Sequence, residues 1–135
     1  MAWTTTVYVS TITWNTNTWT ALTAGGPIRV DISHAGQDIQ DRTGADEYST
    51  FVQVVNKILG ATVFLRSLAQ SGQTLGTKSN MVCTLNGKGG NVVLTLTGMI
   101  IVSCGPSQGR AEPGTVAMGF VHESSDGTTV PIAVS

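Results

Sequence analysis

Residues 80–104 read NMVCTLNGKGGNVVLTLTGMIIVSC, and this stretch decides the class of fold. Apolar residues alternate with small or polar ones on both sides of segment 86–90, which is rich in glycine. A period of two places one set of side chains on a buried sheet face, and a glycine-rich segment between two such runs is typical of a hairpin turn. The stretch therefore predicts paired antiparallel strands.

The same alternation continues to the C-terminus and recurs in the first half of the chain. Runs at 100–102, 116–120 and 130–134 are separated by Gly, Pro, Ser and Asp, and Asp126-Gly127 predicts a second hairpin turn. Further strands are expected at 3–14, 28–33 and 61–66. Many short strands with turn signals between them indicate a mainly β protein, an antiparallel β-sandwich or barrel.

Residues 34–50, HAGQDIQDRTGADEYST, interrupt this pattern. They contain few large apolar side chains, and they have four carboxylates but only one base, Arg42. This composition predicts a long, exposed, acidic loop at about 34–50. Loops of this length usually serve a function or become ordered by a partner.

Two segments are candidates for a helix. Residues 51–59 fit a helical stripe of apolar residues, but their valine-rich composition equally favours a strand. Ser67 as a cap and Gly72 as a stop predict a short helix at 67–72. We therefore expect one short helix beside the sheet.

The chain has 135 residues, which predicts a single domain, 1–135, large enough to fold without disulfide or metal staples. Only 11% of the residues are charged, and 7 Lys and Arg nearly balance 8 Asp and Glu. Bulk attraction to nucleic acid is disfavoured, because duplex binding draws its affinity from a basic patch. A β-rich surface with so little charge suits a protein that is covered by neighbours.

The sequence shows neither a secretory signal at its start nor an apolar run of about 20 residues, so we expect a cytoplasmic site of synthesis and no membrane contact. The two cysteines, Cys83 and Cys104, each lie inside a strand run. Because nothing marks an oxidising compartment, we expect them to stay unpaired.

One motif matches a catalytic pattern. Residues 105–109, GPSQG, form a G-x-S-x-G sequence after a strand. A nucleophile elbow needs a helix after the serine and a parallel α/β sheet, but the sequence continues with Pro113 and Gly114 into another strand. We therefore interpret Ser107 as part of a loop and expect a protein that is not an enzyme.

Metal and nucleotide sites have no clear signature either. His34 and His122 are the only histidines, and neither has a second ligand at the spacing that zinc sites use. Asp38 and Asp41 lack the alternating ligand rhythm of a calcium loop, and Lys78 does not complete a phosphate-binding loop. We expect no metal and no cofactor.

The three tryptophans, Trp3, Trp14 and Trp19, all fall within the first nineteen residues. Their simpler interpretation is core filling or pairing across a small hairpin. The alternative is an aromatic platform for a sugar or a partner, which would make the chain a binding module.

The order of these features resembles that of bacteriophage tail tube proteins. The resemblance rests on the early strands at 7–14 and 28–33, then a loop with Arg42-Thr43-Gly44 and Tyr48-x-x-Phe51-Val52. It continues with the strand at 61–66, a short polar link, the glycine-turned hairpin and the closing GFVHESSDGTTVPI at 119–132. It covers most of the chain as an ordering of strands and turns.

The resemblance implies a β-sandwich protomer with a helix, assembled in the host cytoplasm into stacked hexameric rings of a virion. The long loop would contact the neighbouring subunit or ring, which makes Asp41, Arg42, Asp46, Glu47 and Tyr48 candidate interface residues. Partners would be copies of the chain and other tail or neck proteins, and DNA would pass through the lumen without specific binding. A head decoration or neck protein is the alternative within the virion.

Overall fold

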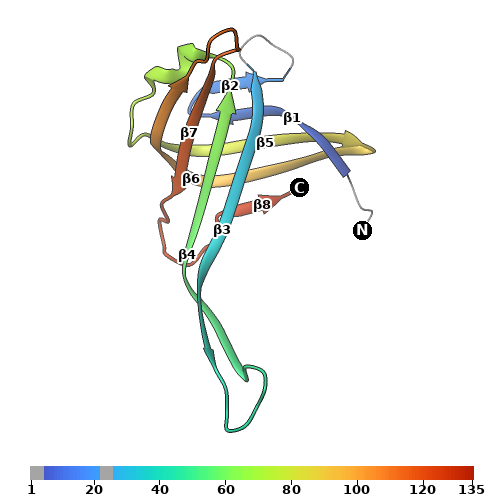
Figure 1. Ribbon diagram of the computed structural model, residues 1–135, viewed down its shortest axis with the longest axis vertical. Helices are drawn as coiled ribbons and strands as arrows, with labels where there is room; N and C mark the ends of the chain where they lie inside the picture. Colours follow the sequence, from blue (N-terminus) through green and yellow to red (C-terminus); the bar gives the residue numbers. More distant parts are fainter. Residues whose placement is uncertain (1–4, 22–25) are drawn as a thin grey trace.

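The computed structural model describes residues 5–21 and 26–135, so Trp3 lies outside the described residues. Strands dominate, and one 3₁₀ helix, η1, lies beside them (Figure 1). In chain order the elements are β1 (Thr5–Trp14), β2 (Asn17–Thr20), β3 (Pro27–Asp41), β4 (Phe51–Leu65), η1 (Leu68–Gly72), β5 (Lys78–Lys88), β6 (Gly90–Ser107), β7 (Thr115–His122) and β8 (Ile132–Val134).

The described strands form one antiparallel sheet with the order β2-β1-β5-β6-β7-β4-β3, and β8 pairs with β6. The first half of β6 pairs with β8 at Leu94–Leu96, whereas its second half pairs with β7 at Met99–Ser107. The two ends of the order, β2 and β3, are not paired with each other, so the sheet is not closed. The expected antiparallel β class is confirmed.

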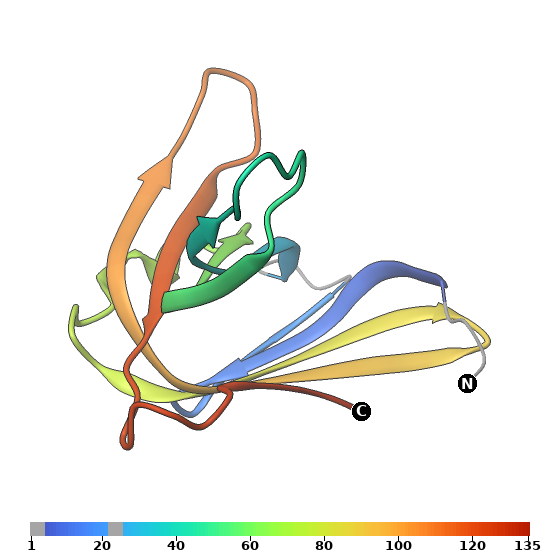
Figure 2. The ribbon, with the colours of Figure 1, turned by 90° about the horizontal axis from the view of Figure 1, so that it is seen from below.

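A bend in β6 folds this single sheet into two limbs (Figure 2). Gly98 lies at the change of partners along β6 and adopts a φ of +62°, which glycine reaches without a steric penalty. The sequence pattern indicated two separate runs here, at 92–96 and 100–102. The structure corrects this, because both runs belong to one strand that turns at a glycine.

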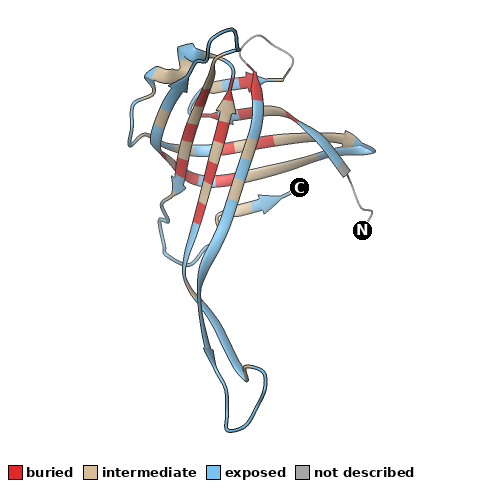
Figure 3. Ribbon diagram, in the orientation of Figure 1, coloured by how far each residue is buried: buried red, intermediate tan, exposed pale blue. Residues whose placement is uncertain are grey.

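The core fills the angle between the two limbs, where the buried residues gather (Figure 3). Trp14 is fully buried, packs edge-on against Phe120 at 5.0 Å between ring centroids, and donates its indole N–H to the Met99 carbonyl at 3.1 Å. Because Trp14 belongs to β1 and Phe120 to β7, this contact joins the limbs. The largest buried side chains come from both: Trp14, Phe120, Ile12, Leu59, Leu65, Met81, Leu96, Met99, Ile101 and Met118.

The helix prediction is confirmed at 67–72, where η1 forms as a 3₁₀ helix. Ser67 is its N-cap residue, but its side chain makes no capping hydrogen bond. The other candidate, 51–59, lies in β4. There the apolar residues fall on both faces of a strand, and this imitates a helical stripe.

The predicted loop at 34–50 is exposed, as expected, but it is only partly a loop. Residues 34–41 continue β3 and pair with β4 from His34↔Leu59 to Asp41↔Phe51. The connection is therefore limited to residues 42–50. The sequence pattern did not predict this strand, because polar side chains on both faces remove the alternation that a half-buried strand shows.

Candidate functional site: the β3–β4 arm and its base

The β3–β4 hairpin projects far beyond the core (Figure 1). We call residues 35–58 the arm. Every side chain in it is exposed except those of Ser49 and Val55, which are half-buried. All the core residues lie outside the arm, so nothing in the described part of the chain covers it (Figure 3).

The arm exposes apolar side chains that a solvated hairpin does not need. Phe51 is 51% exposed, Ile58 62% and Tyr48 80%. Cross-strand partners point to the same face, so the register places Phe51 with Asp41 on one face and Val54 with Asp38 on the other. Further large apolar residues exposed on the arm are Ile39, Val52 and Val54. Neither face of the arm is purely polar.

A bulge marks the base of the arm. Ala35 pairs with Ile58 and Gln37 with Val55, so Gly36 alone opposes Asn56 and Lys57. Asn56 has a φ of +53°, a conformation that Asn tolerates better than most residues. A Cβ atom on Gly36 would lie 2.5 Å from a methyl group of Val54, so a larger residue would have to displace that side chain. Bulges of this kind bend and re-aim a strand pair.

Hydrogen bonds between polar groups order the tip of the arm. The Thr50 amide donates to the Asp41 carbonyl at 2.8 Å, and the Ser49 hydroxyl donates to Gln40 at 3.0 Å. The Arg42 amide donates to the Asp41 carboxylate at 2.8 Å. All five candidate interface residues, Asp41, Arg42, Asp46, Glu47 and Tyr48, are exposed and lie at this tip. Whether they contact a neighbour stays a prediction.

A groove of about 590 Å³ lies at the base of the arm. Its walls come from the arm, from the end of β7 and from the loop 124–131. Both histidines line it, together with Lys57. The register explains why: His34 pairs with Leu59, and Leu59 is next to the Gly60↔Val121 pair, so His34 and His122 share one row across β3, β4 and β7. The larger apolar side chains of the lining are Val54, Leu59, Val130 and Pro131.

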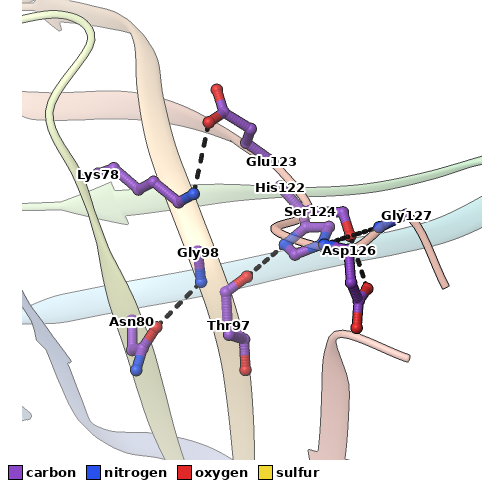
Figure 4. Close-up of polar contacts among 9 residues, drawn as sticks. All are labelled: Lys78, Asn80, Thr97, Gly98, His122, Glu123, Ser124, Asp126 and Gly127. Carbon is purple, nitrogen blue, oxygen red and sulfur yellow. Dashed lines mark hydrogen bonds and ion pairs between the residues drawn. The ribbon is translucent and has the colours of Figure 1, made fainter. Parts of the chain in front are cut away.

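Polar contacts hold the loop that forms one wall of this groove (Figure 4). The Asp126 carboxylate accepts the hydroxyl and amide of Thr129 and the amide of Thr128, and these bonds hold the pKa of Asp126 well below its usual range. The Gly127 amide donates to the Ser124 hydroxyl at 2.7 Å. The Asp126 carboxylate is therefore occupied within its own loop.

Contacts at the bend of β6 fasten the same region to the sheet (Figure 4). The Gly98 amide donates to Asn80 Oδ1 at 3.0 Å, and the Glu123 amide donates to the Gly98 carbonyl at 2.9 Å. Lys78 and Glu123 form an exposed ion pair at 3.4 Å, and the ring of His122 bonds the Thr97 carbonyl. The groove therefore borders a corner of the sheet that these contacts hold together.

The other residues singled out by the sequence do not gather into a site. Ser107 pairs with Thr115 at one end of β6, whereas His122 pairs with Met99 near the middle of that strand. These positions are about 25 Å apart along the strand. No helix follows Ser107 in the described chain.

The tryptophan platform is wrong for two of its three members. Trp14 is fully buried and Trp19 is only 4% exposed, so neither can form a surface for a sugar. They fill the core instead. In the hairpin Trp19 pairs with Ile12 and Trp14 pairs with Asn17, which makes the two indoles diagonal neighbours.

The cysteines are free, as expected: Cys83 is buried and Cys104 half-buried. Burial raises the pKa of the Cys83 thiol to about 11. Among residues 5–21 and 26–135, no cluster of three or more His, Cys, Asp or Glu residues could hold a metal ion. Within the same residues no helix has the length and apolar character needed to cross a membrane.

No family model, curated protein or solved structure matches the chain. The arm and the groove therefore have to be interpreted from their own chemistry.

Proposed function

We propose that this chain is a structural protein that assembles with copies of itself into stacked rings, as a phage tail tube does. The observation that carries the proposal is the arm. An isolated two-stranded hairpin is at best marginally stable in water, and exposed apolar side chains at Tyr48, Phe51 and Ile58 add to its cost. A neighbouring subunit that covers the arm removes both problems.

The open sheet edges support the same proposal. β3 is an edge strand of fifteen residues, and its outer backbone groups are available along the arm. Long exposed edges are templates for pairing with another chain, and proteins normally cover or interrupt them. Closing a ring of subunits covers edges that the single chain leaves open. A sandwich-like or barrel-like protomer, completed by its neighbours, is part of this proposal.

Charge is consistent with a conduit for DNA. The formal net charge is −1, and the described tip of the arm is acidic rather than basic. A lumen without a basic lining lets phosphate groups pass without adhering. On this proposal the protein assembles in the host cytoplasm, resides in the virion, and contacts other tail or neck proteins at the ends of the tube.

Negative-stain microscopy of the purified protein, together with size exclusion over a range of concentrations, tests the proposal. Rings of about six subunits and stacked tubes are expected. Isolated knobs would redirect the proposal to a head decoration protein, and a strict monomer at high concentration would overturn self-assembly.

A shortened variant tests whether the arm carries the assembly. Residues 38–54 are replaced by Asn-Gly, which joins the paired residues Gln37 and Val55 through a two-residue turn. Because every core residue lies outside the arm, this variant is expected to fold and to remain monomeric. Rings formed by the shortened chain would show that the arm is not the assembling element.

A further inference from the structure

The tip of the arm carries a net negative charge, three carboxylates against one base. The connection 42–50 contains Asp46 and Glu47, and Asp41 lies at the end of β3 beside it. Within the described residues, neither Asp46 nor Glu47 has an ion-pair or hydrogen-bond partner for its carboxylate. Arg42 is the single base of this segment. The tip is therefore a compact, exposed, acidic projection.

The lining of the groove at the base of the arm carries one formal charge, the positive charge of Lys57. Lys57 and the two histidines are the titratable groups that line it. Neither carboxylate of the adjoining segment lines the groove: Asp126 stays ionised and accepts the amides of its own loop, and Glu123 pairs with Lys78 at 3.4 Å. Asp38, opposite Val54 at the outer end of the groove, accepts a hydrogen bond from Gln40. Among the described residues Lys57 has no ion-pair partner.

The tip cannot reach the groove of its own chain. Pairing is continuous from Gln37↔Val55 to Asp41↔Phe51, which keeps the arm extended. The strands run about 10 Å beyond Val54, and the connection 42–50, which contains Asp46 and Glu47, extends farther in the same direction (Figure 1). A contact between tip and groove therefore requires two copies of the chain.

We propose that the groove formed by His34, Lys57, His122 and the loop 124–131 receives the acidic tip of the arm of a second copy. Lys57 pairs with Asp46 or Glu47, and the apolar lining at Val54, Leu59 and Pro131 accepts Tyr48, which is 80% exposed. The two surfaces differ, so the contact is heterologous and repeats from copy to copy until a ring closes or a filament grows. This inference rests on the proposed self-assembly and assigns its contact.

Charge reversal tests the contact. Lys57→Glu repels the incoming tip, and Asp46→Lys with Glu47→Lys repels the groove. Each variant is expected to raise the protein concentration needed for assembly by about tenfold or more, as for a lost interfacial charge pair. The three substitutions together restore the attraction with the signs exchanged. This triple variant is expected to assemble with itself and not with the wild-type chain.

A matched control separates the contact from net charge. Lys88 lies exposed at the end of β5, in the hairpin turn before β6, and it does not line the groove. Lys88→Glu combined with Asp46→Lys and Glu47→Lys has the same net charge as the triple variant. It is expected to remain unassembled. Urea unfolding of each monomeric variant checks that the fold is retained.

The outcomes distinguish the contact from the function. Assembly of the wild type, loss in both reversed variants and recovery only with Lys57→Glu support the inference. Assembly that is indifferent to Lys57→Glu, or recovery with Lys88→Glu as well, overturns the contact while leaving self-assembly in place. A wild-type chain that stays monomeric under every condition overturns both.

Discussion

Gly98→Ala adds a single methyl group at the bend of β6 and tests whether that bend requires glycine. Replacing it by alanine places a Cβ atom 2.8 Å from the backbone oxygen of Glu123 and 3.1 Å from Cε of Lys78. The oxygen cannot retreat easily, because the Glu123 amide is bonded to the Gly98 carbonyl at 2.9 Å. The backbone of the alanine must also adopt a φ of +62°, which is unfavourable for a residue with a Cβ atom.

The expected cost has two parts. The left-handed backbone costs about 1–2 kcal/mol for a residue other than glycine, and the overlap with Glu123 adds about 1–3 kcal/mol. The sum predicts that Gly98→Ala lowers the free energy of unfolding by about 2–5 kcal/mol. This is a large share of the roughly 5–15 kcal/mol that is typical of a domain.

Alanine substitutions at two other glycines separate the backbone part of the cost from the overlap part. Gly127 has a φ of +77° with no atom within 4 Å of a Cβ, so Gly127→Ala should cost only the backbone part, about 1–2 kcal/mol. Gly105 lies in the same strand as Gly98 but does not have a positive φ, and a Cβ atom there would have no atom within 4 Å, as at Gly127. Gly105→Ala should change the free energy of unfolding by about 0.5 kcal/mol or less.

Urea unfolding followed by tryptophan fluorescence measures all three, because Trp14 and Trp19 are buried in the core. The shortened-arm background keeps the proteins monomeric, so that assembly does not contribute to the measured stability. A cost for Gly98→Ala no larger than that for Gly127→Ala would refute the role of Gly98 as a fastened bend.

Three further predictions concern the core and the arm. Trp14→Phe removes the hydrogen bond to the Met99 carbonyl and part of the contact with Phe120, and should cost about 2–4 kcal/mol in urea unfolding. Phe51→Ser in the full-length chain should change the free energy of unfolding of the monomer by about 0.5 kcal/mol or less, because Phe51 is 51% exposed and lies outside the core. A loss comparable to that of Trp14→Phe would contradict this. Cys83 should resist alkylation at pH 8, because burial raises the pKa of its thiol from 9.0 to about 11. The unfolded chain loses this proton first, so the contribution of the neutral thiol to stability is complete below about pH 9 and is lost as the pH rises toward 11. The loss amounts to about 3 kcal/mol, and Cys83→Ala should show a flatter decline over that range; identical profiles would exclude this cause.

Much of the fold follows from local patterns. Alternation across residues 80–104 predicted β5 and the two halves of β6 as separate runs, and the glycine-rich segment predicted the turn between β5 and β6, where Gly89 and Gly90 have φ values of +100° and +140°. The cap and stop residues at 67–72 predicted η1. The strands and their turn are visible because burial on one face, or a demanding backbone angle, selects the residue at each position.

The arm shows where local patterns fail. Residues 34–41 lack alternation because neither face is buried, and 51–58 carry apolar residues on both faces. Only the long pairing of β3 with β4 makes them strands. The same holds for Gly98, which a linear pattern cannot distinguish from a turn between two strands.

The sequence by itself determined the antiparallel β class, the turn between β5 and β6, and an exposed acidic segment between residues 34 and 50, whereas the hairpin predicted at Asp126-Gly127 does not form, because β7 and β8 each pair with β6 and not with each other. Only the tertiary structure decided that this segment is the end of an arm, that Trp14 and Trp19 fill the core, and that His34, Lys57 and His122 meet in one groove. The physical reason is that a period of two is a property of neighbouring residues. The order of strands in a sheet is set by which distant residues bury one another, and that order places the groove.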